Sequence, residues 1–369
     1  MINNGKKLVF SEFRNSEQAQ KMAAVLKAYK GRRVTIMEVC GTHTMAIFRY
    51  GIRDILPESI RLVSGPGCPV CVTPSYYINS AILLSQRSDV IITTFGDMMR
   101  VPGSKGSLLK EKAKGSDIRI VYSPLDALRI AEENKGKKVV FLSIGFETTT
   151  PVAALSVLNA YEKGLSNFTL LSANKTVPEA LKVLSADKDI GVDGYIYPGH
   201  VSAIIGTDFY DRIAAEYAVP GVVTGFEPLD VLHSIITLVS NVNNNRIVAE
   251  NQYSRVVSRE GNPLALGKMY EVFEPVDAVW RGIGTIPDSG LKMKDKYAAF
   301  DAWNVFGIKW DNIDEPKGCL CGEVLKGRKT PVECGLFNKA CTPENPVGAC
   351  MVSSEGTCAA YHKYGSGGF

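Results

Sequence analysis

The residue type best suited to chemistry in this chain is cysteine, and its nine copies fall into two groups. The first group lies near the amino terminus and comprises Cys40, Cys68 and Cys71. The second lies near the carboxyl terminus and comprises Cys319, Cys321, Cys334, Cys341, Cys350 and Cys358. An odd total, in a chain with no recognisable secretory signal, argues against a disulfide framework and predicts a reducing cytoplasm. Clustered thiolates therefore predict metal or redox chemistry.

The amino-terminal cysteines are compatible with three kinds of site. A thioredoxin-like dithiol would use Cys68 and Cys71, which form a CxxC motif, but it would give Cys40 no role. A closed zinc site would use all three cysteines with His43, although structural zinc usually draws on two close pairs of ligands. An open iron site would use the thiolates as soft donors and leave coordination positions for small ligands. The spacing alone leaves all three hypotheses open.

The carboxyl-terminal cysteines have the spacing C-x-C-x12-C-x6-C-x8-C-x7-C. A cubane iron–sulfur cluster needs four thiolates, and this segment supplies more than enough. The tight run of cysteines found in ferredoxins is missing, so the spacing indicates a cluster or a zinc site without choosing between them. Whichever two cysteines do not bind the metal would form a redox pair beside it.

The rest of the sequence predicts an α/β fold. Near-continuous apolar runs, typical of strands buried in parallel sheets, alternate with amphipathic helical stretches. These runs span residues 33–39, 61–65, 89–95, 118–123, 138–146, 168–173, 195–199 and 221–226. Two parallel sheets accommodate the runs better than one. After about residue 240 the sequence becomes irregular and rich in glycine and proline, which predicts a third region built around its cysteines.

These strands would bring the amino-terminal cysteine motifs together. The segment EVCGTHT leaves the strand that begins at Arg33, and GPGCPVC leaves the next strand. Ligands bind beyond the carboxyl ends of strands in open parallel sheets, so both motifs lie where a site is expected. The second motif also leads into a predicted helix at Pro74, and the unpaired N–H groups at this nearby helix start would lower the pKa of Cys68 and Cys71.

Two further residues are weaker candidates, and several function classes are excluded. His200 in GHVS and Glu147 in GFETTT both follow predicted strands.

The formal charge of +4 is too small and too dispersed for a nucleic-acid partner. No apolar stretch reaches the roughly 20 residues that a membrane span needs. Neither a Walker A motif nor a GxGxxG after a strand is present, so nucleotide binding has no support.

The motifs around these residues resemble those of the HypD family of hydrogenase maturation proteins. The matching segments cover nearly the whole chain and are EVCGTHT, GPGCPVC, TTFGDMMRVPGS, GFETTTP, YPGHVS and the cysteine-rich tail from CLCGEVLKG to GTCAAY. The resemblance implies a scaffold that assembles the Fe(CN)2CO group of nickel–iron hydrogenases, rather than a conventional turnover enzyme. It implies as partners a small chaperone, HypC, the cyanide donor HypE and, indirectly, the hydrogenase large subunit.

The resemblance also implies a fold and a role for each cysteine. Two Rossmann-like domains, 21–120 and 121–240, would precede a cluster domain, 241–369, with residues 1–20 packed on it. Cys40 would share the iron with the chaperone, and Cys68 and Cys71 would exchange electrons and contact the iron. A 4Fe-4S cluster would be bound by the four residues Cys319, Cys334, Cys341 and Cys358.

Cys321 and Cys350 would then form a redox dithiol beside the cluster. Two alternative functions stay open: a stand-alone, cluster-linked thiol-disulfide oxidoreductase with no iron at Cys40, and a structural zinc protein.

Overall fold

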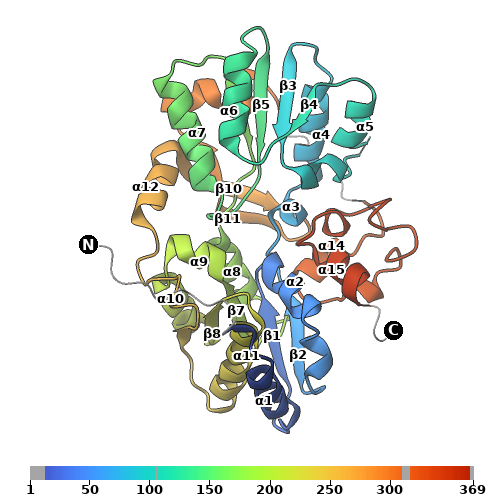
Figure 1. The fold of residues 1–369 in the computed structure, drawn as a ribbon, viewed down its shortest axis with the longest axis vertical. Helices are drawn as coiled ribbons and strands as arrows, with labels where there is room; N and C mark the ends of the chain where they lie inside the picture. Colours follow the sequence, from blue (N-terminus) through green and yellow to red (C-terminus); the bar gives the residue numbers. More distant parts are fainter. Residues whose placement is uncertain (1–12, 105, 310–315, 366–369) are drawn as a thin grey trace.

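Two parallel β-sheets form two lobes in the computed structural model, which describes residues 13–104, 106–309 and 316–365 (Figure 1). Sheet A has the strand order β2 (Ile60–Ser64), β1 (Val34–Glu38), β7 (Gly194–Pro198), β8 (Gly221–Thr224) and β9 (Ala249–Asn251). Sheet B has the order β4 (Ile118–Ile120), β3 (Val90–Thr94), β5 (Lys138–Ser143) and β6 (Phe168–Ser172). Every predicted apolar run overlaps one of these strands, so the α/β class and the two parallel sheets are confirmed.

The sheets do not divide at residue 120, where the sequence predicts a boundary between two domains. The chain leaves sheet A after β2, builds sheet B from β3 to β6, and returns to place β7 beside β1. Sheet A therefore takes strands from both predicted domains. The apolar runs are alike in composition, and nothing in a buried strand's pattern specifies which neighbour it pairs with.

Helices cover both faces of each sheet. The helices of the sheet A lobe are α1 (Ser16–Lys27), α2 (Gly41–Arg49), α8 (Val177–Ala186), α9 (Gly199–Ile205), α10 (Asp208–Tyr217) and α11 (Pro228–Asn243). Those of the sheet B lobe are α4 (Ser75–Ser85), α5 (Leu108–Ala113), α6 (Pro124–Glu133), α7 (Thr150–Glu162), α12 (Pro263–Val272) and α13 (Ala302–Val305). No helix within the described ranges is long and apolar enough to cross a membrane.

Local sequence explains where several helices begin. Ser123 caps α6, and its side chain and that of Asp126 form a reciprocal capping box across the first turn. Pro124 and Pro151 occupy the first turns of α6 and α7, where a proline costs no hydrogen bond. The capping residues and prolines therefore account for where these two helices begin.

The region after residue 240 is more regular than its sequence suggests. Its first part adds β9 to sheet A and packs α12 on α7. An antiparallel hairpin follows, formed by β10 (Phe273–Trp280) and β11 (Gly284–Met293), and Figure 1 shows it between the lobes. The expectation of irregular structure holds only beyond the hairpin, where α14 (Cys321–Leu325) and α15 (Thr357–Tyr364) are short and joined by loops.

The amino-terminal segment lies on the sheet A lobe rather than on the cysteine-rich region. Helix α1 packs on α11, and Arg14 forms an ion pair with Glu227 at the start of α11. The sequence predicts that residues 1–20 pack on the cysteine-rich region. Of these, residues 1–12 lie outside the described residues.

Candidate functional site

Cys40 and the CxxC motif meet at the carboxyl ends of two adjacent strands, as the sequence predicts. Strands β1 and β2 pair in parallel, with Glu38 opposite Ser64. Cys40 caps α2 just beyond β1, while Cys68 caps α3 (Pro69–Val72) beyond β2. The backbone of Gly67 lies so close to that of Cys40 that a Cβ there would overlap the Cys40 backbone. Only glycine permits this approach, which fixes the CxxC loop against Cys40.

Cys68 and Cys71 form a buried disulfide. A short helix that the sequence did not predict begins at Pro69, ahead of the predicted one near Pro74. The Cys71 amide hydrogen points at the Cys68 sulfur, with a nitrogen–sulfur distance of 3.2 Å. A disulfide offers no thiolate, so the closed zinc hypothesis is not satisfied in this state of the protein. Cys68 and Cys71 are both oxidised in this structure.

The Cys40 thiol is buried and lies beside a carboxyl group. Burial, and then the negative charge of Glu355, raise its pKa to about 12. Glu355 is held in place by Thr42, whose hydroxyl donates to the carboxylate over 2.7 Å. The thiol is therefore protonated at neutral pH, and a cation that binds the sulfur must displace this proton.

His43 binds the backbone of the neighbouring strand. Its Nε2 lies 3.1 and 3.0 Å from the carbonyl oxygens of Thr224 and Gly225, and because carbonyls only accept, Nε2 donates. Burial lowers the His43 pKa to about 4, so the imidazole is neutral. The ring stacks on Phe226 with 4.5 Å between centroids. Through these hydrogen bonds His43 connects α2 to the end of β8.

A cleft of about 430 Å³ opens above Cys40, between the two lobes and the cysteine-rich region. Its walls include Cys40, Asp97, Thr148, His200 and Glu355. His200 stacks on the same phenylalanine as His43, with 4.0 Å between centroids, and burial lowers its pKa. The structure thus brings the predicted His200 to Cys40, while His43 is not among the residues that line the cleft.

Sequence reasoning missed Asp97 and Glu355. Asp97 directly follows β3 and accepts a hydrogen bond from Ser353 over 3.0 Å. Its place after a parallel strand was a usable signal. Glu355 arrives from the distant cysteine-rich region, and no spacing in the sequence relates it to Cys40.

Glu147 lies behind the cleft wall and caps a helix. Its two carboxylate oxygens accept from the Val177 amide over 3.0 and 3.3 Å, at the first residue of α8. The carboxyl is 1% exposed, and burial raises its pKa to about 8. It therefore positions α8 rather than contacting anything bound in the cleft.

Glu147→Gln should change how stability depends on pH. The folded pKa lies above the ordinary value of 4.5, so between pH 4.5 and 8 the folded state keeps a proton that the unfolded state has lost. This group alone makes wild-type stability fall as pH rises through that window, by about 1.4 kcal/mol per unit. Glutamine keeps the oxygen acceptor and cannot ionise. Unfolding free energies across this range should show the variant gaining relative to wild type, and parallel curves would contradict the assignment.

All six carboxyl-terminal cysteines line one small apolar cavity. No group of three or more Cys, His, Asp or Glu side chains in the described residues converges to hold a single metal ion. A cubane binds each thiolate at a different iron, so its ligands surround a cavity rather than meet at a point. An all-sulfur donor set around an apolar cavity therefore fits an iron–sulfur cluster.

Within this cavity the sulfurs of Cys321 and Cys350 lie 2.8 Å apart. Cys321 accepts hydrogen bonds from Cys319 and Cys350, which lowers its pKa and raises that of both donors. The positive charge of Arg281 lowers the Cys321 pKa further. On another side, the Val347 amide donates to the Cys341 sulfur over 3.3 Å.

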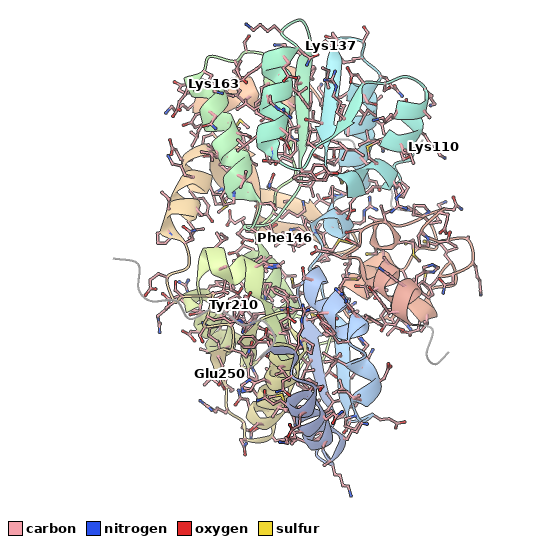
Figure 2. The ribbon with its side chains drawn as sticks, viewed as in Figure 1. Lys110, Lys137, Phe146, Lys163, Tyr210 and Glu250 are labelled. Carbon is pink, nitrogen blue, oxygen red and sulfur yellow. A yellow bond between two sulfur atoms is a disulfide. The ribbon has the colours of Figure 1, made fainter. Side chains whose placement is uncertain are left out.

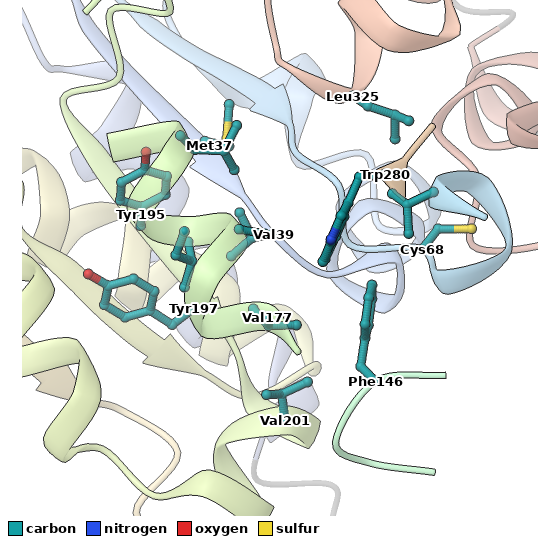
Figure 3. Close-up of a cluster of buried hydrophobic side chains, with 14 of the residues drawn as sticks. Met37, Val39, Cys68, Phe146, Val177, Tyr195, Tyr197, Val201, Trp280 and Leu325 are labelled. Carbon is teal, nitrogen blue, oxygen red and sulfur yellow. The ribbon is translucent and has the colours of Figure 1, made fainter. Parts of the chain in front are cut away.

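The two cysteine groups meet in one buried cluster between the lobes, which we call the junction cluster. It contains the Cys68–Cys71 disulfide, Cys321, Cys350 and Trp280. Helix α3 packs directly on the turn 349–351 that carries Cys350. Figure 2 places Phe146 at the junction, and Figure 3 shows its ring and that of Trp280 near Cys68; the two rings stack 5.7 Å apart.

Comparisons with known proteins agree with this architecture. The family model HypD, described as "Hydrogenase formation hypA family", matches residues 16–365. The hydrogenase maturation factor HypD2 of Bradyrhizobium diazoefficiens is 49% identical over 96% of each chain. HypD of Rhodobacter capsulatus is 47% identical over 96% of this chain and 97% of its own. A putative hydrogenase expression/formation protein of Methanocaldococcus jannaschii is 44% identical over 91% and 94%. The chain therefore belongs to the HypD family of hydrogenase maturation factors.

Proposed function

We propose that the protein is a cytoplasmic scaffold on which an iron ion receives its cyanide and carbon monoxide ligands before transfer to a nickel–iron hydrogenase. The observation that carries this proposal is the position of Cys40. Its sulfur lies on the wall of an interlobe cleft, at a helix start, and its backbone contacts the CxxC loop. A soft donor at such a place can hold the iron and leave most of its coordination positions free.

The cleft suits a protein-assisted assembly. In this proposal a small chaperone, HypC, supplies a second thiolate to the iron, and HypE delivers cyanide through the cleft. Asp97, His200 and Glu355 line the same cleft and offer polar groups beside the cargo iron. The finished group passes to the hydrogenase large subunit, so the protein acts as a redox-active scaffold rather than a conventional turnover enzyme.

A 4Fe-4S cluster is proposed for the cysteine-lined cavity, bound by Cys319, Cys334, Cys341 and Cys358. When bound, such a cluster supplies electrons one at a time. Cys321 and Cys350 are left as a dithiol, and their sulfurs lie 2.8 Å apart. The dithiol side of the cavity faces the junction cluster, where the Cys68–Cys71 disulfide lies.

Thiol–disulfide exchange can then connect the two cysteine groups. The Cys350 or Cys321 thiolate attacks the Cys68–Cys71 bond, and the second thiolate closes a Cys321–Cys350 disulfide. Two electrons and two protons pass to Cys68 and Cys71, which become thiols. The low pKa of Cys321 favours the thiolate that this step requires.

Cys350→Ser should uncouple the two groups. Anaerobic photoreduction of wild-type protein with a deazaflavin, followed by alkylation and mass spectrometry, should find Cys68 and Cys71 as modified thiols. In the variant the Cys68–Cys71 bond should persist, because a serine cannot complete the exchange. Dithiothreitol, which attacks the disulfide directly after denaturation, serves as a control. Equal photoreduction of that bond in both proteins would contradict the relay.

Iron, sulfide and zinc analysis of anaerobically purified protein tests the proposed function. The proposal expects a brown protein with about four iron and four sulfide per chain, and further iron bound when Fe(II) is added with the chaperone. A colourless protein with stoichiometric zinc would overturn it in favour of a structural zinc protein. A cluster with no further iron in wild type would favour the stand-alone oxidoreductase.

A further inference from the structure

A second cavity, beside the hairpin, is lined by none of the cysteines and plays no part in the proposed iron chemistry. It has a volume of about 120 Å³ and lies between the end of β6, the β10–β11 hairpin and α13. Its walls are largely apolar and include Val276, Leu291 and Met293. Such a space is small but enclosed on several sides by regular structure.

One basic side chain in this wall, Lys175, has no ion-pair partner among the described residues. Lys175 follows β6, lines the cavity and is 3% exposed. Among the described residues, the Lys175 ammonium takes part in no hydrogen bond or ion pair. It makes a cation–π contact with the Trp280 ring, whose centroid lies 5.9 Å from Nζ. Lysine is almost never fully buried unless it is paired. Burial without a partner lowers the Lys175 pKa to about 7.

The other charged groups around the cavity are already engaged. Asp301 accepts hydrogen bonds from the Trp303 amide over 3.0 Å and from the Asn304 side chain over 3.2 Å. Asp277, on the rim, accepts the Asp288 amide hydrogen over 3.2 Å. Lys292 lies near acidic groups on the outer surface. None of these groups forms an ion pair with Lys175.

We propose that this cavity binds a small monocarboxylate, whose anionic end pairs with Lys175 and whose short apolar tail lies against the hairpin. A carboxylate would supply the missing counter-charge and accept the ammonium hydrogens. A phosphate would need several cationic or N–H donors, and the wall offers one buried cation. A water molecule has a share of about 30 Å³ in the liquid, so the cavity holds roughly four to six non-hydrogen atoms. Propionate is of this size.

Calorimetric titration of the full-length, anaerobically purified protein tests the proposal. Propionate should bind to wild type, propionamide should bind far more weakly because it lacks the charge, and benzoate should be excluded by size. Lys175→Met should lower propionate affinity by about tenfold or more, the usual effect of losing a charge-assisted hydrogen bond. The matched control, Lys296→Met, removes an exposed lysine that does not line the cavity and should leave the affinity within about twofold of wild type.

The outcomes separate the proposal from simpler explanations. No propionate binding to wild type, or equal affinity for propionate and benzoate, would overturn it without reference to any variant. Equal loss in both lysine variants would indicate non-specific charge and would overturn it as well. Thermal unfolding should find Lys175→Met at least as stable as wild type, because an unpaired buried amine is replaced by an apolar group of similar length. Iron and cluster contents should be unaffected, so this test is independent of the proposed maturation chemistry.

Discussion

Cys334→Ala is expected to reduce the iron and sulfide of the purified protein from about four each per chain to near zero, because a cubane loses one of its four thiolates. The same loss is expected for the other three proposed ligands, Cys319, Cys341 and Cys358. These four cysteines surround one small apolar cavity. Iron and sulfide assays, with visible absorption spectra, measure the effect.

The matched controls are Cys321→Ala and Cys350→Ala. Both residues line the same cavity and are buried, so their replacement perturbs packing to a similar degree. Because the proposal gives them a redox role, both variants should keep the cluster. A full cluster in Cys334→Ala, or loss of the cluster in the two controls alone, would reverse the assignment of ligands and dithiol.

Cys40→Ala should abolish hydrogenase maturation while leaving the cluster intact. In a host whose own HypD gene is deleted, wild-type protein should restore hydrogenase activity, and the variant should leave it at the level of the deletion strain. Alanine removes the only cysteine sulfur among the residues that line the cleft and preserves the cap position of α2. Substantial activity with Cys40→Ala would show that the iron is held elsewhere.

Much of the architecture could be predicted because buried parallel strands have a distinctive pattern. The apolar runs identified every strand of both sheets except β9, whose three residues are only half-buried. The hairpin was missed because β10 has four consecutive exposed residues, Glu274 to Asp277, and β11 is interrupted by glycine and proline. Tertiary contacts, rather than local pattern, decide such strands.

The candidate site was predictable to the extent that it depends on neighbouring strands. Cys40 and the CxxC motif follow strands that are adjacent in sequence and in sheet A, so their proximity followed from the pattern. The contact of Glu355 with Thr42 joins segments more than 300 residues apart, which no local rule anticipates. His43 and Glu147 illustrate the same limit, because their partners on β8 and α8 were visible only once the fold was known.

Infrared spectroscopy of the protein copurified with its small chaperone tests the central claim most directly. Cyanide and carbon monoxide bound to iron absorb where protein is nearly silent, so the cargo can be observed without transfer to a hydrogenase. The account predicts both kinds of band in wild type and neither in Cys40→Ala, with unchanged cluster absorption in the two proteins. Undiminished cyanide and carbon monoxide bands in Cys40→Ala would contradict it.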